Sequence, residues 1–461
     1  MTPLAVRSVQ LVNPPTPAGV SRPTRAGCFP PLDLLALASY LGRIAPDSEV
    51  TVLDGDLLSF GQIVDAIGAD VVGITTKAFT YPQALRIASA AKLRGADVVL
   101  GGPWASAVAH EVLENRPFVD CVVVGQGEAA LGYLARGLSC GGLPGVWTRG
   151  ERGRPVGRPA AALDLDALPP LDYRYCSLNE YRTNYARRFP GDVHTAPVSW
   201  FSHRGCQWRD VSGGCTYCRR HDAPATRRSP ELFWLALGDV VARTKADLVW
   251  DVADTFTAPR EWLAGVAASR PAPLPCSLYV YARPSDLDPG GADLLAEIGC
   301  VQVLMGVESG DDELLRATNK GHTAEEAFRA AVTCADRGIA VFPAFLLGLP
   351  GETEASLRAT VDLAARIVSE ARCREVSSAV LVPLPGTPVY NDLRQCGGAD
   401  QWRADSDLPD LSRAQREWVT RFTKVDLQAL DEANRELQAL VPAPGRSTFG
   451  AMSLDVSARG A

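Results

Sequence analysis

The stretch Ser199–Asp222 reads Ser-Trp-Phe-Ser-His-Arg-Gly-Cys-Gln-Trp-Arg-Asp-Val-Ser-Gly-Gly-Cys-Thr-Tyr-Cys-Arg-Arg-His-Asp. It places three cysteines, Cys206, Cys215 and Cys218, in one glycine-bearing loop, and the apolar run 197–201 before them predicts a buried strand. Thiolates gathered so closely usually hold a metal ion or an iron–sulfur cluster. Because only three thiolates are present, a four-iron cluster in this loop would keep one iron free of protein sulfur, where a substrate can bind.

Two other interpretations stay open on the residues of this loop alone. His221 follows Cys218 by three positions, so Cys206, Cys215, Cys218 and His221 could hold a structural zinc ion. The cysteines could also be buried thiols that bind nothing. The rest of the chain shifts the balance among the three.

Composition limits the class of protein. The chain has 461 residues, enough for two or three domains, and its 46% hydrophobic and 21% charged residues are ordinary for a globular protein in water. A net charge of -7 without a long basic run argues against a nucleic-acid partner. The twelve cysteines are dispersed, unlike those of a secreted disulfide scaffold. No signal peptide and no apolar run of membrane length is present, so we expect a cytoplasmic protein without a membrane partner.

The first part of the chain alternates between β-rich runs and helical stretches. The predicted strands are 6–12, 50–53, 71–76, 98–100 and 120–124. Such alternation is typical of a parallel sheet, where ligands bind beyond the carboxyl ends of the strands. Small, polar or glycine residues stand at these ends: Asn13, Asp54, Thr75, Thr76, Gly101, Gly102, Gly125, Gly127 and Glu128. They are the candidate contacts for a large flat ligand.

Residues 144–193 are rich in Arg, Pro, Asp and Tyr, which predicts a linker with little regular structure. The alternation then resumes. The predicted strands are 197–201, 248–252, 276–281, 301–307, 340–347 and 375–382. Six strands are fewer than the eight of a full barrel, and polar residues again collect at their carboxyl ends. A helical pattern at 415–441 predicts a small cap, and 442–461 is expected to be disordered.

Together these motifs resemble the radical S-adenosylmethionine (SAM) enzymes that carry a cobalamin-binding domain. The resemblance covers residues 6–390 and rests on the order and spacing of the cysteine loop and three later stretches: Glu308-Ser309-Gly310, Gly348–Thr353 and Pro383–Pro388. The resemblance implies an α/β chain: a Rossmann-like cobalamin-binding domain, a partial (β/α)6 TIM-like radical SAM barrel and a small helical C-terminal region. The expected bounds are 1–143, a linker at 144–195, 196–390 and 391–461.

The resemblance also implies the chemistry of the cysteine loop. Cys206, Cys215 and Cys218 would bind three irons of a 4Fe–4S cluster, and SAM would bind the fourth through its amino and carboxylate groups. An electron, from an external donor of the flavodoxin or ferredoxin type, would cleave SAM to a 5′-deoxyadenosyl radical. That radical abstracts hydrogen from an unactivated carbon, and the protein aims it and keeps it dry.

Four SAM contacts follow from family position. Tyr217 would lie beside the adenine, Asp254 near the methionine end, and Glu308 and Ser309 near the ribose. Without the resemblance, Asp254 could equally be a helix cap and Glu308 an acidic residue at a helix N-terminus. No residue is assigned a catalytic role from the sequence.

Two features depart from the family pattern. The usual cysteine spacing is C-x3-C-x2-C, whereas eight residues, Gln207–Gly214, separate Cys206 from Cys215. Expanded loops occur in some relatives, including certain peptide-modifying C-methyltransferases, and the extra residues are expected to change the cover of the cluster or substrate entry. The stretch Asp54–Ser59 also lacks the histidine of Asp-x-His-x-x-Gly. Cobalamin would therefore bind base-off, without a histidine ligand from that loop.

Three outcomes are compatible with these features. In the first, methylcobalamin methylates an unactivated carbon of a specialised-metabolite precursor, with SAM as source of both radical and methyl group. In the second, the substrate radical rearranges, cyclises or contracts a ring. In the third, the chain is a cobalamin-binding sensor with a structural metal site. We expect the first, with a small molecule as substrate; a peptide is the alternative.

Overall fold

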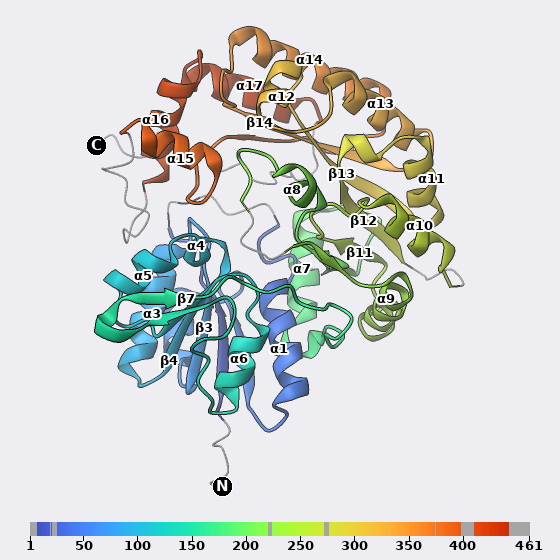
Figure 1. The fold of residues 1–461 in the computed structure, drawn as a ribbon. Helices are drawn as coiled ribbons and strands as arrows, with labels where there is room; N and C mark the ends of the chain where they lie inside the picture. The colour runs from blue at the N-terminus through green and yellow to red at the C-terminus, as the bar shows by residue number, and fades with distance from the viewer. Residues whose placement is uncertain are drawn as a thin grey trace.

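The computed structural model describes residues 7–18, 20, 25–219, 224–271, 276–373, 375–397 and 410–441. The chain forms two α/β units, each built on its own sheet (Figure 1). Helices at the C-terminal end pack on the second unit, and their residues Tyr390, Leu411 and Ala414 also pack in the core of the first. The expected disordered tail, 442–461, and His221 of the zinc alternative lie outside the described residues. The predicted fold class, a Rossmann-like domain followed by a six-stranded partial barrel and a helical C-terminal region, is confirmed.

The first unit contains a seven-stranded sheet in the order β2-β1-β3-β4-β5-β6-β7. The first five strands are parallel, and β6 and β7 are added antiparallel at one edge. The strands are β1 Val9–Asn13, β2 Val50–Asp54, β3 Val71–Thr75, β4 Asp97–Gly101, β5 Cys121–Val123, β6 Val146–Arg149 and β7 Pro155–Gly157. Strand β3 is buried at every position, as expected of a central parallel strand.

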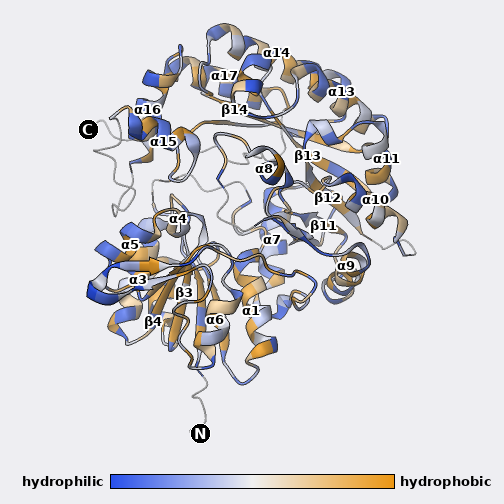
Figure 2. Cartoon of the chain, viewed as in Figure 1, coloured by the Kyte–Doolittle hydropathy of each residue, from blue (hydrophilic) through white to orange (hydrophobic). Residues whose placement is uncertain are grey.

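Helices cover both faces of this sheet, and Figure 2 shows its strands as mostly hydrophobic. Alternate residues of one strand point to opposite faces. Val71 therefore packs against α1 and α6, and Val72 packs in the core formed with α2 to α5. The helices are α1 Leu32–Ile44, α2 Phe60–Ala66, α3 Tyr81–Leu93, α4 Gly102–Ala107, α5 Ala109–Asn115 and α6 Glu128–Ala135.

The prediction of little regular structure in the linker is wrong for two parts of it. Strands β6 and β7 form a hairpin that extends the first sheet, and α7 (Leu178–Arg188) is an eleven-residue helix. Helix α7 buries Tyr181 and Tyr185. Composition suggested a loop because charged and proline residues dominate here, but edge strands and a helix exposed on one side need few apolar residues.

The second unit is a six-stranded parallel sheet in the order β15-β14-β13-β12-β11-β8. Its strands are β8 Pro197–Trp200, β11 Leu248–Asp251, β12 Ser277–Ala282, β13 Cys300–Glu308, β14 Ala340–Leu347 and β15 Ser377–Val380. The sheet curls, with its helices on the outer face (Figure 1). These helices are α9 Pro230–Thr244, α10 Arg260–Ala268, α11 Pro289–Glu297, α12 Asp312–Ala317, α13 Ala324–Ala335 and α14 Glu354–Glu370.

The C-terminal helices cover the β15 edge of the barrel. The single helical pattern expected at 415–441 forms two helices, α16 (Leu411–Phe422) and α17 (Leu427–Ala439), after α15 (Pro388–Gln395). The break comes where Asp426 caps α17 by accepting a hydrogen bond from the Ala429 amide. Fully buried Trp418 donates from Nε1 to the Gly348 carbonyl at 2.8 Å, which ties α16 to the end of β14.

Within the described part of the chain, no helix combines the length and the apolar character needed to cross a bilayer.

Candidate functional site

The three cysteines lie in a loop at the carboxyl end of β8. Cys206 is the residue before α8 (Gln207–Ser212), a short helix that sequence analysis did not predict. Gly213 and Gly214 follow with φ of 85° and 81°, a backbone conformation that favours glycine. They turn the chain into Cys215 and Cys218, whose backbones are joined by a 3.0 Å hydrogen bond. All three cysteines are partly exposed and unbridged.

The three thiols have the chemistry and the number that a four-iron cluster with one open iron needs. Among the described residues, no three His, Cys, Asp or Glu side chains are gathered closely enough to hold one metal ion. Three partly exposed, unbridged thiols in one loop can each bind a different iron, so this donor set fits a cluster.

The inserted helix α8 is fixed to the barrel rather than free. Trp208 donates from Nε1 to the Asn319 carbonyl at 2.8 Å, and Asn319 Nδ2 donates to the Ser212 and Gly214 carbonyls at 3.0 and 2.8 Å. Gly321 lies so close that a Cβ there would come within 2.5 Å of the Trp208 ring. The insert is therefore held on the loop that follows α12.

The same loop contacts Glu308, one of the predicted SAM residues. Lys320 Nζ lies 2.8 Å from Glu308 Oε1 in a mostly buried ion pair. Burial raises the pKa of the Tyr217 hydroxyl well above its ordinary range, and the neighbouring Glu308 and Cys215 raise it further. The Tyr217 hydroxyl thus stays protonated, with Cys215 and Glu308 as its neighbours. The Ser309 hydroxyl is already occupied by neighbouring residues: it lies 3.2 Å from Thr360 Oγ1 and accepts a hydrogen bond from the Asp311 amide.

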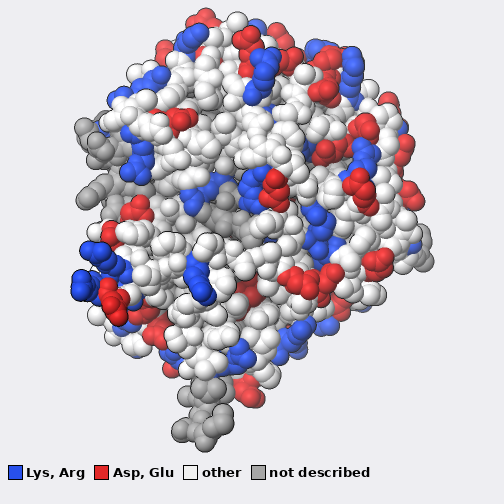
Figure 3. Space-filling model, in the orientation of Figure 1, with Lys and Arg blue, Asp and Glu red and all other residues white. Residues whose placement is uncertain are grey.

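A cavity of about 340 Å³ lies between the two sheets. The first unit contributes strand ends and apolar walls. The second unit contributes the start of the cysteine loop and Asp254, one of the four predicted SAM contacts. The lining residues that matter here are Asp33, Leu37, Thr75, Gly101, Gly102, Gly125, Gln126, Gly127, Glu128, Leu131, Phe201, His203, Arg204, Val252 and Asp254. On the face seen in Figure 3 the surface is hollowed between the two units, and charges of both signs are interspersed.

Six of the nine residues predicted to contact cobalamin line this cavity: Thr75, Gly101, Gly102, Gly125, Gly127 and Glu128. The glycine that ends β4 and the glycine that begins α4 differ. At Gly102, with φ 83°, a Cβ would come within 2.7 Å of Thr75 Oγ1 and the Thr76 amide. At Gly101 a Cβ would meet nothing closer than the Val123 carbonyl at 3.8 Å. Glycine is therefore needed at Gly102 by the fold, whereas at Gly101 it leaves open space beside the cavity.

The other three predicted contacts do not line the cavity. Asn13 donates from Nδ2 to Asp54 Oδ1 at 2.7 Å, and Tyr181 of α7 donates its hydroxyl to Asp54 Oδ2 at 2.5 Å. Thr76 is fully buried and donates to the Gly101 carbonyl. Asn13 and Asp54 hold the linker helix to the sheet, and Thr76 supports the glycine turn. A strand-end position predicts the edge of the sheet but not the direction of the side chain.

One ion pair joins the two units at the cavity. Arg204 Nη1 lies 2.7 Å from Glu128 Oε1 and donates to Gln126 Oε1 at 2.7 Å, while its guanidinium covers the Phe201 ring at 4.5 Å. Glu128 is only 2% exposed, so its charge is compensated mainly by Arg204. Glu128 thus lines the cavity and also fixes the cysteine loop to the first unit.

Sequence analysis missed several residues of the site. His203 and Arg204 stand just before Cys206 at a strand end, a position that could have singled them out. Asp33 accepts a hydrogen bond from Thr75 Oγ1 at 2.8 Å, and only its place near the start of α1 hints at this. Lys320 carries no sequence signal, because its pairing with Glu308 depends on how the loop after α12 folds.

Family models match two segments of the chain. Residues 21–135 match the B12 binding domain and residues 200–364 match the radical SAM superfamily. The first segment contains α1 and all the glycine strand ends of the cavity. The second runs from the cysteine loop into α14.

Several similar proteins align with most of the chain. An uncharacterized methyltransferase of Pyrococcus horikoshii is 25% identical over 84% of this chain and 83% of its own length. TsrM from Kitasatospora setae, a radical SAM methyltransferase solved with tryptophan substrate and a SAM analogue, is 23% identical with a TM-score of 0.68, covering 94% of this chain and 89% of TsrM. OxsB, a cobalamin-dependent SAM radical enzyme, has a TM-score of 0.71 at 16% identity, covering 94% of this chain and 66% of OxsB. The two solved structures share the fold. The chain therefore belongs to the radical SAM enzymes that carry an N-terminal cobalamin-binding domain.

Proposed function

We propose that this chain is a cobalamin-dependent methyltransferase that methylates an unactivated carbon of a specialised-metabolite precursor. One observation carries the proposal: a single cavity is lined by the glycine strand ends of the B12 binding domain and by Arg204 and Asp254 of the radical SAM barrel. A substrate at this boundary could meet both cofactors, which methyl transfer to a carbon radical requires. When bound, the cluster and SAM supply the radical, and cobalamin supplies the methyl group.

The residues of the first unit suit cobalamin. Leu37 and Leu131 give the cavity apolar walls, and Gly101, Gly125 and Gly127 bring bare backbone to its rim. Apolar walls favour the detached nucleotide base of a base-off cobalamin, and bare backbone favours close approach of the corrin. The absence of histidine from Asp54–Ser59 agrees with base-off binding.

The residues of the second unit suit the cluster and SAM. Cys206, Cys215 and Cys218 would hold the cluster, and Tyr217, Asp254 and Glu308 would face SAM. Lys320 fixes the Glu308 carboxylate through their 2.8 Å ion pair. Ser309 would act on the SAM site by shaping the loop rather than through its hydroxyl, which is already hydrogen-bonded.

The relatives support methyl transfer and leave the substrate open. Two of the similar proteins are described as methyltransferases, and one of these was solved with tryptophan, a small molecule. We propose a small-molecule substrate and an external flavodoxin- or ferredoxin-type donor. We also propose domain bounds of 1–143, 144–195, 196–390 and 391–461, with the β6–β7 hairpin of the linker paired onto the sheet of the first domain. A peptide substrate remains the alternative.

The proposal is tested on protein reconstituted anaerobically with iron, sulfide and cobalamin, given candidate substrates and SAM with a deuterated methyl group. Methyl transfer predicts a labelled product, with 5′-deoxyadenosine and S-adenosylhomocysteine in equal amounts. If 5′-deoxyadenosine forms but the product is unlabelled, the reaction is rearrangement, cyclisation or ring contraction and the proposal fails. If no 5′-deoxyadenosine forms with any substrate, the result favours the alternative of a cobalamin-binding sensor with a structural metal site.

A further inference from the structure

The concave face of the barrel sheet carries an aromatic cage. Trp250 of β11, Tyr279 of β12 and Phe342 of β14 lie in one cluster, separate from the core that the other face of these strands forms with the outer helices. Trp250 and Tyr279 are stacked, with ring centres 5.7 Å apart. Glu375, just before β15, adds a carboxylate to this cage.

The cage holds a guanidinium group that comes from the first unit. Arg25 Nη2 lies 3.2 and 3.3 Å from the two Glu375 carboxylate oxygens. The guanidinium carbon lies 5.1 Å from the Trp250 ring centre, 5.5 Å from that of Tyr279 and 5.9 Å from that of Phe342. Planar guanidinium groups pack well on aromatic faces and pair with carboxylates. Arg25 is thus bound by residues that lie hundreds of positions away in the chain.

The segment that carries Arg25 also reaches the proposed cobalamin cavity. Phe29 packs edge-on against Trp250, with ring centres 5.0 Å apart. The Gly27 carbonyl accepts from Asn184 Nδ2 of α7 at 3.0 Å. A few residues later, Leu32 and Asp33 at the start of α1 line the cavity. A short stretch of chain therefore contacts both the inside of the barrel and the wall of the cavity.

We propose that Arg25 is a positioning residue, which holds the start of α1, and with it the cobalamin cavity, at a fixed place relative to the barrel. The inference rests on the proposed function, because it assumes that the cavity holds cobalamin and that the cysteine loop holds the cluster. Methyl transfer needs cobalt and the radical carbon at a set separation, and small misplacements are costly. A buried guanidinium locked by a carboxylate and several rings gives a rigid attachment of this kind.

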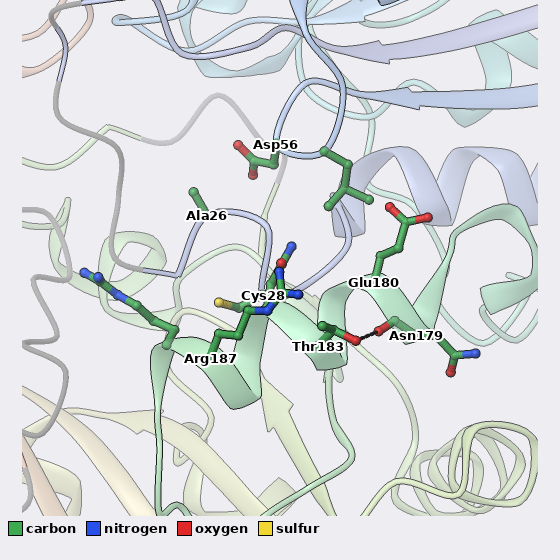
Figure 4. Close-up of a pocket in the computed structure, with 10 residues that line it drawn as sticks. Ala26, Cys28, Asp56, Asn179, Glu180, Thr183 and Arg187 are labelled. Carbon is green, nitrogen blue, oxygen red and sulfur yellow. Dashed lines mark hydrogen bonds between the residues drawn. The ribbon is translucent and has the colours of Figure 1, made fainter.

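The outer side of the same turn makes the idea testable by chemical rescue. Ala26 and Cys28 line a polar cavity of about 740 Å³, which α7 borders with Asn179, Thr183 and Arg187 (Figure 4). Methylguanidinium matches the group that Arg25→Ala removes, and this cavity brings solvent to Ala26, the residue next to Arg25. Arg25→Ala would leave the cage without its cation, and methylguanidinium can then replace the lost group.

The experiment measures the dipolar coupling between cob(II)alamin and the reduced cluster by pulsed electron paramagnetic resonance in the reconstituted holoenzyme. The Arg25→Ala variant is expected to show a shifted and broadened distance distribution, with cobalamin and iron still bound. Methylguanidinium should narrow the distribution, and Glu375→Gln should show a smaller shift in the same direction. The control is Arg337→Ala, which removes another ion-paired arginine, 2.6 Å from Asp293 on the outer helices, and should leave the distribution unchanged.

The outcomes separate the two proposals. An Arg25→Ala distribution identical to that of the native protein overturns the role of Arg25 and leaves the proposed function intact. The role of Arg25 is also overturned if methylguanidinium does not reverse the change in Arg25→Ala and Glu375→Gln shows the native distribution. In that case the loss of the cation from the cage would not be what changed the distance. If the native protein shows no coupling, the proposed placement of both cofactors fails, and the inference fails with it. If Arg25→Ala does not fold, Glu375→Gln decides by the same measurement.

Discussion

The guanidinium carbon of Arg283 lies 4.1 Å from the centre of the Trp208 ring, so an arginine at the end of β12 stacks on the helix inserted between the first two cysteines. Arg283 also donates to the Lys320 carbonyl, and Lys320 pairs with Glu308. The insertion thus connects the cysteine loop to a proposed SAM contact. We interpret the insertion as a support that holds the cysteine loop in place, more than as a cover for the cluster.

Replacing Trp208 should loosen the cysteine loop. Trp208→Ala removes the stacking on Arg283 and the hydrogen bond to Asn319, a loss of about 2 kcal/mol. We expect lower iron retention after reconstitution and desalting, and faster amide hydrogen exchange over 207–218. Val211→Ala is the matched control, because Val211 lies on the same helix and is 66% exposed. If the two variants retain equal iron and exchange at equal rates, α8 does not brace the loop.

The cysteine assignment makes a second prediction. Reconstituted protein should hold about four irons per chain and, when reduced, show a signal that SAM perturbs. Replacing Cys206, Cys215 and Cys218 together by alanine should abolish both. Cys396→Ala is the control, since Cys396 is an exposed thiol beyond the barrel. Stoichiometric zinc in the native protein, or iron and SAM cleavage that survive the triple replacement, would reject the assignment.

The sequence predicted the strands well because their signal is local. All six barrel strands fall where apolar runs end in polar residues, and the cysteine loop follows the first of them. What it could not predict depends on contacts between distant residues. Asn13 and Asp54 were expected to contact cobalamin, but Asn13 forms a hydrogen bond with Asp54, and Asp54 forms another with Tyr181. Nothing within β1 or β2 indicates which way these side chains point.

Short elements and the partners of buried charges could not be predicted from the sequence either. Helix α8 has six residues, too few for a helical pattern to stand out, and its end is marked only by Gly213. The position of Arg25 is set by residues from four barrel strands or their ends, so no spacing in the sequence reveals it. Hairpin β6–β7 was missed because edge strands tolerate the glycine and arginine of 145–157.

Gly101 offers a direct test of the cobalamin cavity. Its Cβ position is open and its φ of -142° suits any residue, so Gly101→Leu should fold while its side chain fills space beside the cavity. We expect cobalamin affinity to fall about tenfold or more, equivalent to about 1.4 kcal/mol. Binding is measured by retained cobalamin absorbance over a titration.

Two further variants sharpen this test. Gly68→Leu is the control: Gly68 is exposed, away from the cavity, and also has open space at its Cβ position. Gly102→Leu should instead destabilise the protein, because the side chain would collide with Thr75 and Thr76. Unchanged cobalamin affinity in a folded Gly101→Leu protein would mean that cobalamin does not bind in this cavity.

Glu352 makes a prediction about pH. Its carboxylate accepts from the Gly348 and Leu349 amides and from Ser356 Oγ, yet burial raises its pKa from 4.5 to about 7. Between these pH values the folded protein keeps a proton that the unfolded chain has released. Glu352 therefore contributes stability that is fully present below about pH 4.5 and is lost as the pH rises to about 7, at most about 3 kcal/mol.

The measurement is the temperature of thermal unfolding at several pH values from 5 to 8, for the native protein and Glu352→Gln. The amide oxygen of Gln can accept the two backbone hydrogen bonds that Glu352 Oε2 accepts, so the loop after β14 should keep its shape. We expect the variant to lose less stability than the native protein as the pH rises, because it has no carboxyl group to ionise. Parallel pH curves for the two proteins would mean that Glu352 stays ionised in the folded state, with its three hydrogen bonds outweighing the cost of burial.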